Sequence, residues 1–293
     1  MTSLNHEIVT TPPRASATVV LLRDGEQGLE VLLLRRHGAS DVLGGAYVFP
    51  GGKLDPDDSA QSALQRLSAP LELLHARLGE PELGMSDAAG FFVAACRETF
   101  EEAGVLLARD AGAEQAGQAI EYARAGARFG DLLARLDLQL AVDRLVPWSR
   151  WVTPKVPSMM RKRFDTRFFV AALPDGQEAC HDDHEATECL WIRPRSALER
   201  YWNRELVMAP AQIMSLVHLA RHGDVAGVLD EAATRPPPRI EPEPHQRDDH
   251  RLLVYPGDPM HSVPARAMPG PTRLLHRDDR FEPPSGGLEG WFD

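Results

Sequence analysis

Cysteine, basic charge and long apolar runs are all scarce in this chain of 293 residues. Its three cysteines, Cys96, Cys180 and Cys189, are too few and too irregularly spaced for a disulfide framework, so a reducing compartment fits best. With 32 basic against 43 acidic side chains, the formal net charge of -11 disfavours nucleic acid as a general partner. No apolar run approaches the roughly 18 residues needed to cross a bilayer, and the start lacks a signal peptide pattern. We therefore expect a cytoplasmic protein that does not bind membranes.

The remaining composition is that of an ordinary folded domain, with 43% hydrophobic and 26% charged residues. Proline is unevenly distributed, because half of the 24 prolines lie in residues 234–293. We expect an N-terminal arm over residues 1–16, a main domain over 17–233 and a Pro-rich C-terminal extension over 234–293. Short strand-like pieces in the extension predict that it packs on the core or on a partner subunit.

Apolar periodicity predicts strands and helices in mixed order. The β-branched and Leu-rich runs at 17–23 and 29–35 flank DGEQG and predict a buried hairpin. Leucines at spacings of three and four over residues 59–85 predict helix, which Pro70 and Pro81 divide into two short helices. Further strand and helix patterns follow without strict alternation, so we predict an α/β (α+β) sandwich.

A well-marked helix carries the chemistry. We expect it to begin with Ser86 as N-cap and to end at Gly104. Within it Glu98, Glu101 and Glu102 stand at i, i+3 and i+4 and therefore share one face. Carboxylates so close repel each other by a few tenths of a kcal/mol per pair. A divalent cation such as Mg²⁺ or Mn²⁺ would relieve that repulsion, although a solvated acidic face is the commoner reason for such a pattern.

These residues, taken with FPGGKLD upstream, resemble the Nudix box, G-x5-E-x7-R-E-U-x-E-E-x-G-U, where U is a bulky apolar residue. RETFEEAGV matches its second half, with Thr99 a weak choice for U. The first half departs from the pattern, since Asp58 stands where the box has Glu and 38 residues separate it from Arg97. A box split by an insertion is typical of the branch named nucleoside diphosphate-linked moiety X motif 19, which includes acyl-coenzyme A diphosphatases.

The resemblance implies an α/β/α sandwich with a mixed sheet, in which residues 59–85 form a helical insertion. It implies that Glu98, Glu101 and Glu102 bind Mg²⁺ or Mn²⁺ together with the Gly52 carbonyl. Arg97 would form an ion pair that orients a glutamate. The implied reaction is hydrolysis of a diphosphate bond by metal-activated water.

The general base is left open by the sequence. The resemblance allows a base on the helix, where Glu98 and Glu102 are the candidates, or one on a later loop, where Glu185 and Glu188 are. Each loop residue is as plausibly a solvated carboxylate.

The resemblance favours coenzyme A as the substrate, because the segment before the box resembles the motif LLTxRSx3Rx3Gx3FPGG of coenzyme A-cleaving members. Three positions depart from it, at Leu34, His37 and Asp41, so one cationic contact is missing. A basic cluster downstream is a candidate replacement that would bind phosphate. The substrate-binding candidates are Arg36, Gly45, Phe49, Pro50, Gly51, Arg161 and Arg163.

Several alternatives stay open. ADP-ribose, NADH or another nucleoside diphosphate derivative would use the same chemistry, and a Nudix-like sensor would bind a ligand without cutting it. The insertion is a candidate lid over the site or a candidate homodimer interface. Two cysteines and two histidines lie within ten residues, but their spacing is not that of a standard zinc site, so we interpret them as ordinary loop residues: Cys180, His181, His184 and Cys189.

Overall fold

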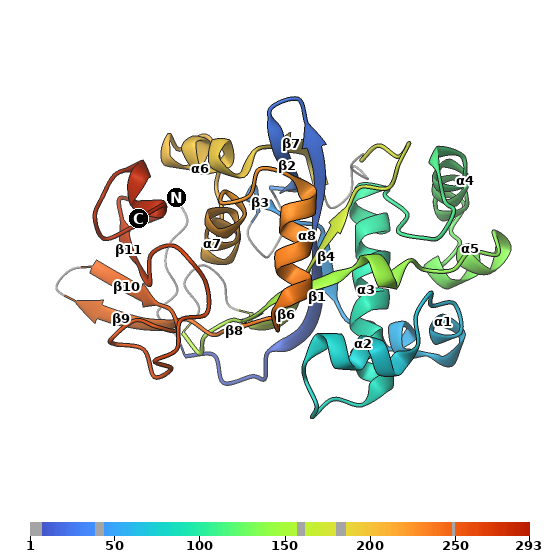
Figure 1. Cartoon of the computed structure of the whole chain (residues 1–293), viewed down its shortest axis with the longest axis horizontal. Coiled ribbons are helices and arrows are strands. Elements are labelled where there is room, and N and C mark those ends of the chain that lie inside the picture. The colour runs from blue at the N-terminus through green and yellow to red at the C-terminus, as the bar shows by residue number, and fades with distance from the viewer. Residues whose placement is uncertain (1–7, 39–43, 157–161, 180–185, 248–249) are drawn as a thin grey trace.

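The computed structural model describes residues 8–38, 44–156, 162–179, 186–247 and 250–293. Its centre is a mixed sheet of eight strands with helices on both faces (Figure 1). The hydrogen-bonded order is β3-β2-β1-β6-β5-β8, while β4 pairs with β1 and β7 with β2. The strands are β1 (Arg14–Gly25), β2 (Gly28–Arg36), β3 (Tyr47–Val48), β4 (Gly51–Lys53), β5 (Val146–Val152), β6 (Phe164–Ala172), β7 (Ala186–Ile192) and β8 (Arg239–Ile240). This arrangement confirms the predicted α/β sandwich.

The predicted hairpin is present as β1 and β2, paired antiparallel, and β1 also pairs parallel with β6. Successive side chains of a strand point to opposite faces. Val19 and Leu21 therefore pack on one side of the sheet, and Val20 and Leu22 on the other, all fully buried. Because both faces of β1 are covered, its sequence reads as a continuous apolar run.

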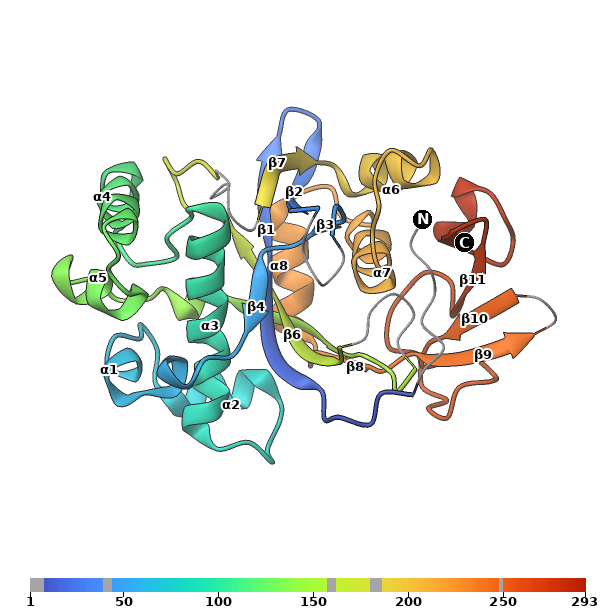
Figure 2. The ribbon, with the colours of Figure 1, turned by 180° about the vertical axis from the view of Figure 1, so that it is seen from behind.

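The helices divide between the two faces (Figures 1 and 2). One face carries α3 (Met85–Ala103) with α1 (Gln61–Leu64), α2 (Leu71–Leu78), α4 (Ala113–Arg124) and α5 (Phe129–Arg135). The other face carries α6 (Pro194–Trp202), α7 (Pro210–Leu219) and α8 (Val225–Thr234). Three short 3-10 turns complete these elements, at Pro56–Ser59, Val142–Arg144 and Leu288–Trp291.

The two short helices predicted in the insertion are α1 and α2, and α2 follows Pro70 directly. Leu74 and Leu78 of α2 are buried against α3. Just beyond α2, the buried carboxylate of Glu80 accepts a hydrogen bond from Arg167 of β6 at 2.9 Å. The insertion is therefore anchored to both the helix and the sheet.

Helix α3 ends as predicted but begins earlier. Gly104 takes the left-handed conformation at its C-terminus, with φ at 67°. The prediction of Ser86 as N-cap is wrong, because Gly84 is the N-cap and Ser86 lies in the first turn. Glycine is also accepted at the N-cap position, so the helix can begin after Gly84, before it reaches the serine. The buried Thr99 donates its hydroxyl to the Ala95 carbonyl at 2.7 Å, which explains how a polar residue fits an apolar position.

Residues beyond 234 share the core of the main sheet. Tyr255, Phe281 and Trp291 are almost fully buried in the same apolar cluster as Trp148 of β5. A second, antiparallel sheet forms here in the order β12-β11-β10-β9 (Figure 1). Its strands are β9 (Glu243–Arg247), β10 (His250–Val254), β11 (Arg273–Arg277) and β12 (Arg280–Glu282).

Candidate active site

The strand β4 brings two glycines against the glutamates of α3. The amide of Gly51 donates a hydrogen bond to Glu102 Oε2 at 2.8 Å. A Cβ placed on Gly52 would lie 2.4 Å from the carboxylate atoms of Glu98, far inside contact distance. Gly52 can approach Glu98 this closely because it has no side chain.

Arg97 organises the acidic groups around it. It donates two hydrogen bonds to Asp58, at 2.8 and 2.9 Å, and one to the Lys53 carbonyl at 3.0 Å. Its Nη1 also contacts Glu98 at 2.8 Å and Glu101 at 2.9 Å. Burial alone would lower the pKa of Arg97, but the surrounding carboxylates raise it overall, so the guanidinium stays charged.

Asp58 belongs to this cluster, although the sequence did not mark it as a candidate site residue. It is 2% exposed and holds Arg97 although 38 residues separate the two. The 3-10 turn Pro56–Ser59 positions it, since Asp58 Oδ2 also accepts the Asp55 amide at 2.8 Å. The turn sequence DPDD was the available signal, because Asp followed by Pro and another acid three residues later is a helix-start pattern.

The glutamates differ in exposure. The side chains of Glu98 and Glu102 are 12% and 7% exposed, whereas that of Glu101 is 46% exposed. Arg36 at the end of β2 reaches within 3.9 Å of Glu102. Four carboxylates, counting Asp58, lie beside the guanidiniums of Arg97 and Arg36. A partly open, oxygen-rich cluster fits a hard divalent cation.

Three other substrate-binding candidates make structural contacts, one through its ring and two through backbone groups. Phe49 is 2% exposed and packs edge-to-face on Phe168, so its ring belongs to the core. The Pro50 carbonyl accepts the Val19 amide at 2.9 Å. Gly45 has φ at 77°, and its amide donates a hydrogen bond to the Arg36 carbonyl at the end of β2 at 3.1 Å.

Glu188 lies away from the α3 glutamates. It accepts a hydrogen bond from the Tyr47 hydroxyl at 2.8 Å and pairs in register with Arg35. Tyr47 belongs to the apolar cluster on the α7 face of the sheet, opposite α3. Burial first, and then Glu188, raise the pKa of Tyr47, which therefore remains a proton donor to that carboxylate.

Arg163 also lies apart from the glutamates. It is 7% exposed, donates to the Thr153 carbonyl at 2.9 Å and lies 3.7 Å from Glu241. These contacts join Arg163, just before β6, to Thr153, just after β5, and to Glu241, beyond α8. Glu185, Arg161, Cys180, His181 and His184 fall outside the described residues.

A model of the NUDT19 Nudix domain matches residues 8–219, a span that includes Asp58, Arg97 and all three α3 glutamates. The chain belongs to this Nudix family. A chicken (Gallus gallus) protein named acyl-coenzyme A diphosphatase NUDT19 is 30% identical over 230 residues, which cover 65% of this chain and 61% of that protein. The human protein of the same name is 29% identical over 68% of this chain and 63% of its own length.

Among solved structures, a Nudix hydrolase from Alicyclobacillus acidocaldarius superimposes with a TM-score of 0.59 at 26% identity. The match covers 75% of this chain and 97% of that one. The chain matches less than two thirds of the length of the chicken and human relatives. No helix in the described part of this chain is long and apolar enough to span a membrane.

Proposed function

We propose that this Nudix chain hydrolyses the diphosphate bond of coenzyme A or an acyl-coenzyme A in a reaction that depends on Mg²⁺ or Mn²⁺. The observation that carries the proposal is the close packing of Gly51 and Gly52 against Glu102 and Glu98, beside the fully paired Arg97. The names of the chicken and human relatives support coenzyme A derivatives as the substrate class.

The residues fit a divalent cation. Glu98, Glu101 and Glu102, with the Gly52 carbonyl, would hold it through oxygen atoms alone, the donor type that Mg²⁺ prefers. When bound, such a cation neutralises diphosphate charge and acidifies a water molecule. Arg97 holds the carboxylates of Glu98 and Glu101 in place through its 2.8 and 2.9 Å contacts.

Arg36 is the strongest candidate for a direct contact with the diphosphate. It ends β2 next to Glu102 at 3.9 Å, and its side chain is 23% exposed, which places a partly exposed cationic side chain beside the carboxylate cluster. A phosphate oxygen beside it would gain a charge-assisted hydrogen bond. We keep Arg161 as a second candidate for a phosphate contact because it belongs to the basic run MMRKRFD in the sequence.

For the general base, the helix candidates Glu98 and Glu102 are favoured over Glu188. Glu188 faces Tyr47 on the opposite side of the sheet from α3, which counts against proton transfer in a site built on α3. Glu185 immediately precedes Ala186, the partner of Arg36 in β7, so it is the remaining loop candidate.

A substrate panel tests the proposal. Purified chain with Mg²⁺ should cut coenzyme A into 4′-phosphopantetheine and 3′,5′-ADP, resolved by chromatography, and should prefer it to ADP-ribose and NADH. Glu98→Gln, Glu101→Gln and Glu102→Gln should each lower kcat/KM by about 100-fold or more, since a metal contributes several kcal/mol of charge stabilisation.

The matched control is Glu121→Gln on the exposed face of α4, which should leave the rate unchanged. A preference for ADP-ribose or NADH would refute the coenzyme A assignment while retaining the chemistry. Binding of these compounds without cleavage would instead identify a ligand sensor.

A further inference from the structure

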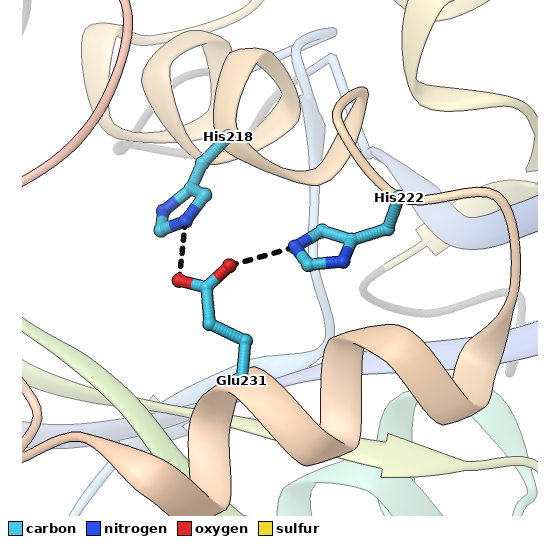
Figure 3. A group of neighbouring side chains, drawn as sticks. All are labelled: His218, His222 and Glu231. Carbon is cyan, nitrogen blue, oxygen red and sulfur yellow. Dashed lines mark hydrogen bonds and ion pairs between the residues drawn. The ribbon is translucent and has the colours of Figure 1, made fainter.

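A second group of metal-ligating side chains lies on the opposite face of the main sheet from α3. His218 of α7 and His222, four residues later, both direct Nε2 at the carboxylate of Glu231 in α8 (Figure 3). The His218 nitrogen lies 2.7 Å from Oε1, and the His222 nitrogen lies 2.9 Å from Oε2. One ligand atom from each residue lies within 4.8 Å of the other two.

The framework that carries these side chains is fixed on several sides. Between the helices, the Gly223 carbonyl accepts the Leu29 amide at 2.9 Å, and Asp24 accepts the Val225 amide at 2.9 Å. Both contacts tie the α7–α8 connection to the β1–β2 hairpin. The His218 ring lies 4.4 Å from the Trp148 ring, which is 1% exposed.

A carboxylate between two imidazoles is the ligand set of many zinc sites. We propose that His218, His222 and Glu231 form a zinc-binding site, separate from the carboxylate cluster on α3. The site would take three protein ligands and leave a fourth position for water. The Glu231 side chain is 32% exposed, so solvent reaches part of this ligand.

The separations fit an ion after a small adjustment. Two ligand atoms on a tetrahedral zinc ion, each about 2.1 Å from it, lie about 3.4 Å apart. The present separations of 2.7 and 2.9 Å must therefore widen, and the partly exposed Glu231 side chain can turn to allow this.

Arg235 supplies the outer contact that a ligating carboxylate normally has. Its Nε donates to Glu231 Oε1 at 2.8 Å, and its guanidinium lies 4.4 Å above the Trp148 ring. Oε1 can keep this hydrogen bond while Oε2 binds the ion. Two imidazole nitrogens favour zinc over magnesium, whereas the α3 cluster offers oxygen only.

The experiment measures zinc binding to the full-length chain after chelator treatment, in excess Mg²⁺ and against a chromogenic zinc chelator. We expect one zinc equivalent per chain and a zinc-dependent rise in Tm. His222→Ala and Glu231→Gln should each weaken binding at least tenfold and abolish the rise in Tm. Because Glu231→Gln preserves the shape of the side chain, weaker zinc binding by this variant would not be explained by unfolding.

Two controls give the result its meaning. His245→Ala removes a histidine whose Nε2 lies 3.9 Å from Glu243, a looser imidazole–carboxylate pair, and should bind zinc as the unmodified chain does. Glu101→Gln disrupts the α3 cluster and should retain the zinc equivalent, which separates this proposal from the proposed hydrolase function. Absence of zinc binding, or equal binding by His222→Ala, Glu231→Gln and the unmodified chain, would overturn the proposal.

Discussion

Replacing Asp58 by Asn tests how much the ion pair between Asp58, before the insertion, and Arg97, after it, stabilises the fold. Asp58 accepts two hydrogen bonds from Arg97, and its side chain is 2% exposed while that of Arg97 is 15% exposed. Asparagine keeps nearly the same volume but loses the negative charge and one acceptor oxygen. The variant therefore leaves Arg97 buried beside a neutral group, with little change in packing.

The expected loss follows from what Arg97 retains. Removing one partner of a fully buried ion pair costs about 3–5 kcal/mol. Arg97 keeps Glu98, Glu101 and the Lys53 carbonyl as partners, and the asparagine oxygen keeps one hydrogen bond. We therefore expect the free energy of unfolding to fall by about 2–3 kcal/mol, which corresponds to about 3–5 °C in Tm for a chain of this length.

Urea unfolding followed by circular dichroism measures this loss. The matched control is Asp57→Asn, because Asp57 pairs with Arg128 at 3.2 Å but the two side chains are 74% and 81% exposed. That change should cost less than about 0.5 kcal/mol. If the two variants have the same free energy of unfolding, Asp58 does not stabilise the buried Arg97 and the reasoning fails.

Four further substitutions test other parts of the structure. Gly52→Ala should displace the flexible Glu98 carboxylate, which lowers activity at little cost in stability. Gly51→Ala places a Cβ 2.4 Å from the Ala17 carbonyl oxygen and should lower Tm. Equal Tm values for the two variants would contradict this contrast. Burial would raise the pKa of Asp258, but Arg273, the Met260 amide and Thr272 lower this pKa overall. The ionised Asp258 therefore stabilises the folded state above about pH 4, and this stabilisation is lost as the pH falls through the lowered pKa. Asp258→Asn should therefore flatten the acid limb of a plot of unfolding free energy against pH, and an unchanged limb would refute the assignment. Trp291→Ala should cost about 3–5 kcal/mol in urea unfolding, because its fully buried ring fills the core shared with Trp148; a cost below about 1 kcal/mol would show that the C-terminal residues contribute little to that core.

Local patterns were sufficient for most of the secondary structure. The β1–β2 hairpin, the two insertion helices and the end of α3 at Gly104 follow from apolar periodicity, proline and glycine. These signals are short-range, because the backbone conformation of a residue depends mainly on its neighbours. The start of α3 escaped the prediction because two residues close together, Gly84 and Ser86, both suit an N-cap.

Long-range contacts decided what the candidate site residues touch. Asp58 departs from the box pattern in residue type and in its spacing from Arg97. The folded insertion nevertheless brings the two residues together in an ion pair. Phe49 and Arg163 looked available for a ligand, but one packs in the core and the other binds backbone carbonyls. A sequence pattern does not say which face of a strand meets which neighbour, so Glu188 could not be assigned to Tyr47 beforehand.

The sequence by itself indicated the family through its box residues, and its local apolar periodicity indicated the layered fold and the helix that carries the three glutamates. Only the tertiary structure brought Gly52 against Glu98 and Glu231 between His218 and His222. The physical reason is the same in both places. Each cluster joins separate elements, and their meeting depends on how the sheet and helices pack around a shared core.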